Sequence, residues 1–261
     1  MTTLANLSPA DAAGLLVTSR PHRDKRGLYW AEGVRAACRS LRRRSDVAGV
    51  VWSPRLCVSR PSRKAVRSLA SGGVPVDEVS PEAFRPLSRH PHASGVGLVM
   101  RQRWTPLPKL RAAADARFLV VETVNTAGNL GTMLRTAEAA GAAAVICVGP
   151  HADPFDPACV RASMGSAAHV RLCRTTAASL ADWCGREVVE LLAMCPRGET
   201  DWRHVPRDGR PIAVAVGEER RGLSPELRAA CTRSVRLPVL GQADSLNVAV
   251  AAGVMLYASL P

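Results

Sequence analysis

Residues 235–261 read VRLPVLGQADSLNVAVAAGVMLYASLP, and this stretch decides the fold that we expect. A short apolar run over 235–240 breaks at Gly241, and the apolar pattern resumes as a helix expected over 246–260. The polar residues between them lie where a strand passes into a helix. Backbone N–H groups at helix starts are unpaired and strand ends form a crevice, so this loop is a candidate ligand site. An ordinary capped helix is the alternative.

Strand and helix patterns alternate upstream of this stretch, as they do in α/β proteins with a parallel sheet. Strands are expected over 118–122, 143–148, 170–173, 188–194, 212–216 and 235–239. Helices are expected over 130–140, 157–164, 177–185 and 225–231, before the helix over 246–260. This regular pattern predicts one α/β domain over 117–261.

The preceding residues predict a second, smaller α/β domain over 1–103 and a linker over 104–116 that is rich in Pro, Lys, Arg and Ala. Helices are expected over 8–17, 32–44 and 60–70, with a helix start at 80–84. Strands are expected over 47–52 and 74–76, and a further strand ends near 100. His90 and His92 could suggest a metal site, but no third ligand has a suitable spacing, so a turn pair is favoured.

The charge balance points to a polyanionic partner. The chain carries 35 Lys and Arg against 22 Asp and Glu, a formal net charge of +13. So basic a surface attracts nucleic acid. A GC-rich genome would explain the preference for Arg over Lys, but it would not explain the excess of basic residues over acidic residues. The expected RNA contacts lie on two basic helices, for which a solvated helix face is the alternative. They are Arg35, Arg39, Arg42, Arg43, Arg63 and Lys64.

The eight cysteines are scattered without metal-ligand spacing, so we expect reduced thiols and no metal site. No apolar run is long enough to cross a bilayer, and the polar N-terminus has no signal pattern. We therefore expect a soluble, cytoplasmic protein that does not bind a membrane.

Three loops of the second domain carry polar residues at the carboxyl ends of predicted strands. The first contains Asn129, Gly131 and Arg135, and an Arg at such a junction can grip a phosphate in a bidentate way. The second is the segment 217–224, and the third is the segment 241–247. The first loop lacks the third glycine of a dinucleotide-binding motif, which disfavours a nucleotide-dependent oxidoreductase.

In order along the chain, these loops resemble the three motifs of the SpoU (TrmH-type) RNA 2′-O-ribose methyltransferases of the SPOUT superfamily. The matching residues are Asn129-x-Gly131-x-x-x-Arg135-Thr-Ala, Gly217-x-Glu219-x-x-Gly222-Leu, and Leu237-Pro238 with Ser245-Leu246-Asn247-Val248. Glu32-Gly33-Val34-Arg35 and the segment 88–96 resemble the family's RNA substrate-binding domain. Two positions depart from the pattern: Ala127 stands where a Pro is common, and Arg220-Arg221 adds charge.

The resemblance implies a parallel sheet with a C-terminal trefoil knot, an exception to the rule that chains are unknotted, and an N-terminal domain of ribosomal-protein-like fold. It also implies a homodimer in which the first motif of one subunit faces the cofactor of the other. The implied cofactor is S-adenosyl-L-methionine. The implied cofactor-binding residues are Ala193, Met194, Cys195, Gly217, Glu219, Gly222, Leu237 and Leu246.

The implied reaction moves a methyl group from a sulfonium to a ribose 2′-OH, whose proton must leave. Such a step needs alignment more than acid–base strength. The family assigns the position of Arg135 a base role, but a guanidinium is a poor base, so we interpret Arg135 as a phosphate clamp that orients the hydroxyl. Asn129 and Glu219 would shape the site. Ser245 and Asn247 would position the ribose or hold the knot loop.

Large-subunit rRNA is the expected substrate, because this type of N-terminal domain usually accompanies rRNA targets. Ribosome maturation and self-resistance to an antibiotic are both open as roles. A tRNA 2′-O-methyltransferase and an RNA-binding protein without catalysis are the alternatives, although the presence of Arg135, Glu219 and Asn247 argues against the second.

Overall fold

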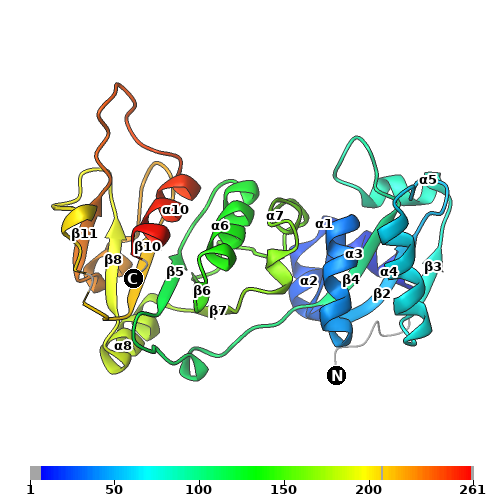
Figure 1. Ribbon diagram of the computed structural model, residues 1–261, viewed down its shortest axis with the longest axis horizontal. Helices are drawn as coiled ribbons and strands as arrows, with labels where there is room; N and C mark the ends of the chain where they lie inside the picture. The colour runs from blue at the N-terminus through cyan, green and yellow to red at the C-terminus, as the bar shows by residue number, and fades with distance from the viewer. Residues whose placement is uncertain (1–6, 207, 260–261) are drawn as a thin grey trace. The chain divides into compact units, whose positions relative to one another are not determined.

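The computed structural model describes residues 7–206 and 208–259, which form two compact units. The first unit contains residues up to Arg103 together with Pro154–Ala168. The second contains Trp104–Asp153 and the residues from His169 onward. The chain therefore leaves the second unit once, after its second strand, and returns to it (Figure 1).

The first unit is built on a four-stranded sheet in the order β1-β4-β2-β3. Its strands are β1 (Leu28–Glu32), β2 (Val47–Trp52), β3 (Val76–Glu78) and β4 (Val96–Arg101). The strand β4 is antiparallel to β1 and β2, and β3 pairs parallel with β2.

Most helices of the first unit begin at residues whose side chains cap them. They are α1 (Pro9–Thr18), α2 (Arg20–Arg26), α3 (Val34–Ser40), α4 (Arg60–Ser71), α5 (Pro81–Phe84) and α7 (Pro157–Ala162), with 3-10 turns η1 (Leu41–Asp46), η2 (Arg85–Leu87) and η4 (Ser166–Ala168). The side chains of Ser8, Ser59 and Ser80 each accept a backbone N–H of the helix that follows, and a Pro stands in the first turn of each helix. This arrangement turns α1 so that Leu16 packs in a core with Trp30 and Phe84.

Two predictions in this unit are wrong in detail. The helix expected over 32–44 begins only at Val34, because Glu32 pairs in β1 and Gly33 has φ +110°. It ends at Ser40 and continues as η1, where Arg43 has a non-helical φ of −138°, so the basic residues do not share one helix face. The strand expected over 74–76 forms two residues later, as β3.

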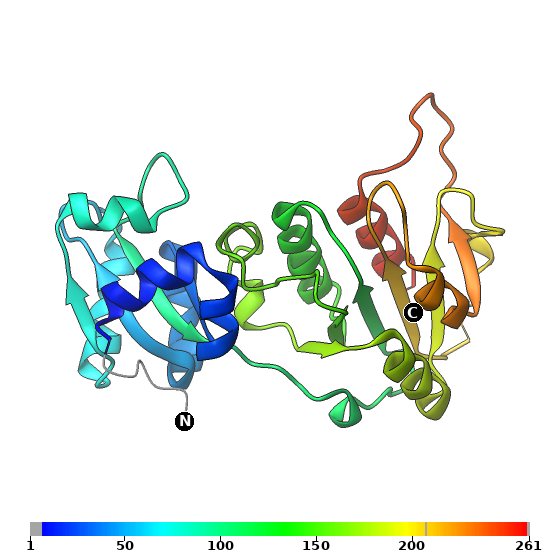
Figure 2. The same cartoon turned by 180° about the vertical axis from the view of Figure 1, so that it is seen from behind.

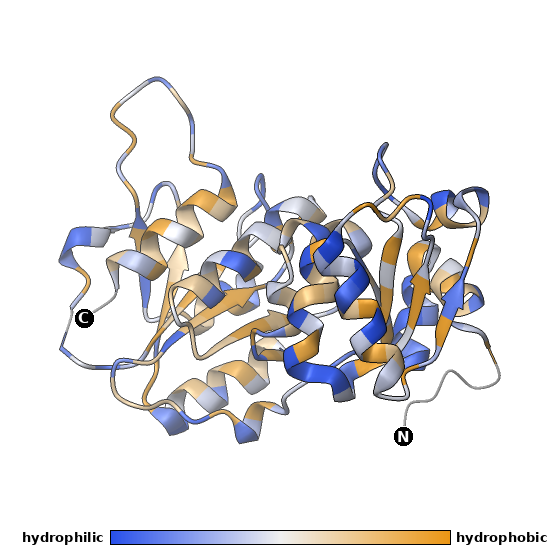
Figure 3. Cartoon of the chain, turned by 45° about the vertical axis from the view of Figure 1, so that its right-hand side comes forward, coloured by the Kyte–Doolittle hydropathy of each residue, from blue (hydrophilic) through white to orange (hydrophobic). Residues whose placement is uncertain are grey.

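The second unit is a seven-stranded parallel sheet in the order β7-β6-β5-β10-β8-β11-β9. Its strands are β5 (Arg117–Val121), β6 (Ala144–Val148), β7 (Leu172–Thr175), β8 (Glu190–Met194), β9 (Thr200–Asp201), β10 (Ile212–Val216) and β11 (Arg233–Arg236). The central strands β5, β6 and β10 are buried along their whole length. Sheets covered on both faces have this continuous apolar character, which Figure 3 shows as apolar strands.

Helices cover both faces of this sheet. One face packs against α8 (Ala177–Glu187) and α9 (Pro225–Ala230), where Trp183 meets Phe118 edge to face with ring centroids 5.0 Å apart. The other face carries α6 (Ala127–Ala139) and α10 (Val248–Ala258), which pack against each other, and α10 also packs on β10 (Figure 2). The 3-10 turns η3 (Leu107–Lys109) and η5 (Trp202–His204) complete the unit.

Several predicted bounds in the second unit shift. Residues 104–116, expected to be a linker, pack into this unit: Leu107 and Leu110 are buried in its core. The strand β8 starts later than expected because Val188 has φ +55° and ends α8. The strand β11 ends at Arg236, and α10 begins at Val248, while Leu260 lies outside the described residues.

The cysteines of this structure are free thiols, and most are buried. Burial raises the pKa of the Cys184 thiol to about 12 and the pKa values of Cys173 and Cys231 to about 11. These thiols therefore remain protonated near neutral pH. Within the described ranges, no group of three metal-ligating side chains occurs, and no helix is long and apolar enough to span a membrane.

The close contact of Gly97 with Trp30 gives a stability prediction for the first unit. A Cβ atom at Gly97 would lie 2.0 Å from Cη2 of Trp30, whose indole is buried. Replacing Gly97 by Ala should therefore lower the free energy of unfolding by about 2 kcal/mol or more, measured by urea denaturation. Gly14 lies within α1 with nothing near its Cβ position, so the control Gly14→Ala should stabilise the protein by about 0.5–1 kcal/mol. Equal stability of the two variants would contradict this packing.

Candidate functional site

A cavity of about 570 Å³ lies at the carboxyl ends of β8, β10 and β11. Its wall comes from residues 193–197, 216–223 and 237–251, with gaps in the last range, and from Arg228. The residues predicted to bind a cofactor all line it: Ala193, Met194, Cys195, Gly217, Glu219, Gly222, Leu237 and Leu246. Carboxyl ends of parallel strands are the usual ligand site of such sheets, so the cavity lies where the topology favours it.

The second motif forms a tight loop at the edge of the cavity. The amide of Glu218 donates to the carbonyl of Gly222 at 3.0 Å, and the amide of Gly222 donates back to Glu218 at 2.8 Å. Gly222 has φ +71°, and a Cβ at Gly217 would lie 2.2 Å from the carbonyl oxygen of Gly222. The chain's own backbone fills the space beside Gly217, so no side chain fits there.

One hydrogen-bonded chain joins the three motifs. The Nδ2 atom of Asn129, at the start of α6, donates to Oε1 of Glu219 at 3.0 Å. The Nδ2 atom of Asn247 donates to Oδ1 of Asn129 at 3.2 Å. Asn125 adds to this chain by donating its backbone amide to Oε2 of Glu219 and its side-chain amide to Glu218, at 3.4 and 3.2 Å. Asn129 is not part of the cavity wall, but it holds two residues that are.

Asn247 also begins the last helix. Its Oδ1 accepts the backbone amides of Ala249 and Val250 at 2.9 and 3.3 Å, so it is the N-cap of α10. Its amide nitrogen remains free to donate to Asn129. The same side chain therefore fixes the helix start and the first motif, while Ser245 lies two residues earlier on the cavity wall and is exposed.

Arg135 lies away from the cavity of its own chain. It is exposed on α6 and is not among the lining residues. It stands six residues beyond Asn129, which corresponds to about 9 Å along a helix axis. The structure thus brings Asn129, Glu219 and Asn247 together but leaves Arg135 separate from them.

Two residues that support the loops around the cavity were not predicted from the sequence. Glu122 follows β5 and accepts the backbone amide and the hydroxyl of Ser224, at 2.7 and 2.5 Å, which fixes the start of α9 after the cavity loop. Gly198 packs so closely on β11 that a Cβ would lie 2.6 Å from the carbonyl carbon of Val235. An acid directly after a buried apolar run was a usable signal for Glu122. The sequence contained no such signal for Gly198, because Val235, on which it packs, is distant in sequence.

The lining of the cavity combines both charge signs with apolar walls. Glu218, Glu219 and Asp244 supply negative charge, and the positive charge comes from arginines. These are Arg197, Arg220, Arg221 and Arg228. A pair between Arg221 and Glu218, at 3.8 Å, is largely exposed and contributes little stability. Such a lining suits a ligand with an apolar ring system and charges of both signs.

The basic residues predicted to contact RNA all lie in the first unit. Arg35, Arg42, Arg43 and Lys64 are exposed and Arg39 is half-buried. Arg63 uses its guanidinium internally, donating to the carbonyls of Cys57 and Pro54 at 2.8 and 3.2 Å. The histidine pair forms a turn in which the amide of His92 donates to Nδ1 of His90 at 2.9 Å.

Comparison with known proteins agrees with this geometry. The SpoU rRNA Methylase family matches residues 116–257. The 23S rRNA (guanosine(2553)-2′-O)-methyltransferase RlmP of Bacillus subtilis (strain 168) is 33% identical over 151 residues, which cover 58% of this chain and 60% of RlmP. This chain thus spans less than two thirds of that relative.

Two further proteins match over most of their length. The 23S rRNA (uridine(2479)-2′-O)-methyltransferase of Streptomyces viridochromogenes is 26% identical over 250 residues, 93% of this chain and 85% of that protein. The crystal structure of an AdoMet-bound rRNA methyltransferase from Sinorhizobium meliloti superposes with a TM-score of 0.85 at 29% identity, covering 99% of this chain and 96% of that one.

The tight approach of Gly217 to Gly222 can be tested in the isolated protein. Replacing Gly217 by Ala should open the loop, because the added methyl group collides with backbone that cannot rotate away. Amide exchange at Glu218 and Gly222 should then become at least about tenfold faster. Gly241→Ala is the matched control, since nothing lies near its Cβ position. Unchanged exchange in Gly217→Ala would remove the steric role given to this residue.

Proposed function

The chain belongs to the SpoU rRNA Methylase family, and on this premise we propose that it transfers a methyl group from S-adenosyl-L-methionine to a ribose 2′-OH of large-subunit rRNA. The observation that carries the proposal is the hydrogen-bonded chain from Asn247 through Asn129 to Glu219, which joins all three motifs beside one cavity. The two named relatives act on 23S rRNA, which favours rRNA over tRNA. One acts on a guanosine and the other on a uridine, so the shared chemistry is at the ribose.

The residues of the cavity fit the cofactor. A volume of about 570 Å³ is within the range of small-molecule sites, and the wall offers apolar side chains such as Val216, Leu223 and Leu237 to an adenine ring. Backbone groups of residues 193–195 and of Gly217 would hold the polar edges, and the acids and arginines of the wall would hold the amino and carboxyl groups. When bound, S-adenosyl-L-methionine supplies a methyl group activated by its sulfonium.

The protein's own contribution is alignment. Asn129 and Asn247 fix the positions of Glu219 and of the loop that contains Ser245, so the ribose would meet a preorganised surface. A guanidinium at Arg135 would hold the phosphate next to the target ribose and orient its hydroxyl, while a phosphate oxygen or water accepts the proton. In this mechanism no residue of the site acts as a strong base.

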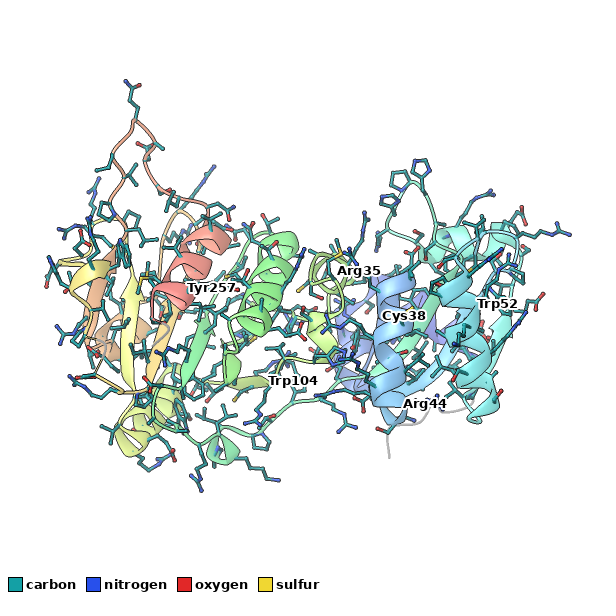
Figure 4. All side chains as sticks on the ribbon, viewed as in Figure 1. Arg35, Cys38, Arg44, Trp52, Trp104 and Tyr257 are labelled. Carbon is teal, nitrogen blue, oxygen red and sulfur yellow. The ribbon has the colours of Figure 1, made fainter. Side chains whose placement is uncertain are left out.

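We propose that the active form is a homodimer. Val250, Val254 and Tyr257 form a stripe on α10 that is 52%, 38% and 52% exposed (Tyr257 in Figure 4). They recur at helical spacing and form one apolar surface, which is typical of a self-complementary interface. Because Arg135 is exposed on the adjacent helix α6 and outside its own cavity, a second copy docked there would supply it to the cavity in trans.

We also propose that the C-terminal segment is knotted. The strand β11 lies beyond β8, yet α10 packs on β10 and α6, so residues 237–247 must return across the sheet edge. This segment rises well beyond the strands before it turns back (Figure 1). A return past the loop 217–222 is the path that the family's trefoil knot would take.

The first unit would supply RNA affinity through its basic surface, whether the role is ribosome maturation or antibiotic self-resistance.

Replacement of Arg135 by Ala tests the catalytic assignment. Methyl transfer to deproteinised large-subunit rRNA should fall at least roughly 100-fold, because the target hydroxyl loses its orienting group. Binding of S-adenosyl-L-methionine, measured by isothermal titration, should remain as in the wild type, since Arg135 does not line the cavity of its own chain and its proposed contact is with the RNA phosphate. Arg186, exposed on α8, provides the control Arg186→Ala. Near-normal turnover of Arg135→Ala would overturn the role, and binding of a nicotinamide cofactor instead would overturn the reaction class.

Charge placed in the apolar stripe tests the dimer. Val254→Lys should convert a dimer at micromolar concentration into a monomer of 27.7 kDa, because a lysine cannot be buried unpaired in the interface. Val58, which is 83% exposed in the first unit, provides the control Val58→Lys. Sedimentation equilibrium distinguishes the two states. A wild-type monomer at that concentration would contradict shared active sites.

A further inference from the structure

A second cavity lies within the first unit, away from the three motifs. It has a volume of about 190 Å³ and is lined by residues of α3, β1, β4 and the segment from α7 to η4. Tyr29, Ala31, Leu98 and Met100 of the sheet contribute apolar surface to its wall, and Val160 adds to it from α7. Arg35, Arg39, Arg161 and Met164 also line it. The cavity thus combines an apolar wall with several guanidinium groups.

Two arginines of this cavity, Arg35 and Arg161, donate to neutral partners. Arg35 extends from α3 toward the α7 segment (labelled in Figure 4), where Nη1 donates to the thioether sulfur of Met164 at 2.8 Å. Arg161 donates to the carbonyl of Arg89 at 3.3 Å. Both partners are neutral, and in the described part of the chain neither Arg35 nor Arg161 forms an ion pair. An added phosphate would therefore not have to displace a carboxylate.

Glu32, the acidic residue in the wall of this cavity, already accepts hydrogen bonds. Glu32 accepts three hydrogen bonds at Oε1, from the hydroxyl of Ser88 at 3.0 Å and from the amide and hydroxyl of Ser94 at 2.9 and 3.0 Å. These bonds hold the carboxylate at the end of β1. Its charge is balanced by several arginines, so the cavity keeps a net positive potential.

The wall also contains strained backbone. Met164 has φ +54° and is 40% exposed, and Gly165 has φ +93°. A Cβ at Gly165 would lie 2.9 Å from Cδ of Arg39, so the turn is shaped to let that side chain lie across it. A non-glycine residue in this conformation costs free energy that packing must offset, and such strain is concentrated at ligand sites.

We infer that this cavity receives one unstacked base of the RNA substrate, with Arg35 and Arg161 contacting the adjoining phosphates. The inference rests on the proposed function for the identity of the RNA. The cavity is smaller than the roughly 300 Å³ at which sites for whole small molecules begin, so it suits a base whose sugar and phosphate stay outside. Proteins read single-stranded RNA by such splayed bases held beside aromatic and guanidinium groups.

A charge-neutral filling variant separates this cavity from a general basic surface. Ala36 of α3 lines it, so Ala36→Trp should occupy it without changing the protein's charge. Affinity for deproteinised large-subunit rRNA should fall about tenfold, while the slope of log affinity against log salt stays unchanged. Ala70→Trp, at an exposed alanine of α4 outside the cavity, is the matched control and should bind as the wild type. Arg161→Gln should instead reduce the salt slope by about 0.7.

The outcomes distinguish this inference from the proposed function. Equal affinities of Ala36→Trp and Ala70→Trp would overturn the base pocket even if the wild type methylates rRNA. A tenfold loss confined to Ala36→Trp would support the pocket even if no methyl transfer were found. A loss seen with assembled large subunits but not with naked rRNA would mean that a ribosomal protein occupies the cavity, which overturns the inference. If thermal unfolding shows that Ala36→Trp is not folded, an unchanged salt slope in Arg161→Gln would overturn it.

Discussion

The site depends on the side-chain amide of Asn129, which accepts from Asn247 and donates to Glu219. An amide is suited to this position because it offers a donor and an acceptor at once, whereas a carboxylate only accepts. Loops from three distant parts of the sequence end at this group, so its geometry sets the register of the 217–222 loop against the start of α10. Without this amide, each loop would keep its local structure but would lose the hydrogen bonds that fix its position relative to the other loops.

Charge is distributed unequally between this site and the rest of the protein. The cavity wall contains acids and arginines in similar numbers, although the chain as a whole carries a net charge of +13. A polyanion is attracted by the whole surface at long range, while a small ligand with charges of both signs is selected within a balanced cavity. The two kinds of recognition therefore need not compete for the same arginines.

Local patterns were sufficient to predict elements whose cause is local. The strands β2 and β10 have their expected bounds because each is a continuous apolar run, and the capped starts of α1, α4 and α5 follow from Ser-x-Pro and Ser-Pro signals. The cofactor-binding residues that the family resemblance implied lie in the wall of the cavity. The failures have distant causes: Glu32 pairs with β4 and shortens the following helix, and the clash that requires glycine at Gly217 comes from Gly222.

The excursion of Pro154–Ala168 into the first unit constrains how the protein is made. Tyr29 of β1 stacks near Phe155, with ring centroids 4.7 Å apart, so the first unit lacks part of its packing until this segment is available. During synthesis from the N-terminus, at roughly 5–20 residues per second, residues up to Arg103 must wait while two strands of the next unit are made. The first unit therefore cannot complete its packing before residue 168 is made, and a single cut after Arg103 separates it from this segment.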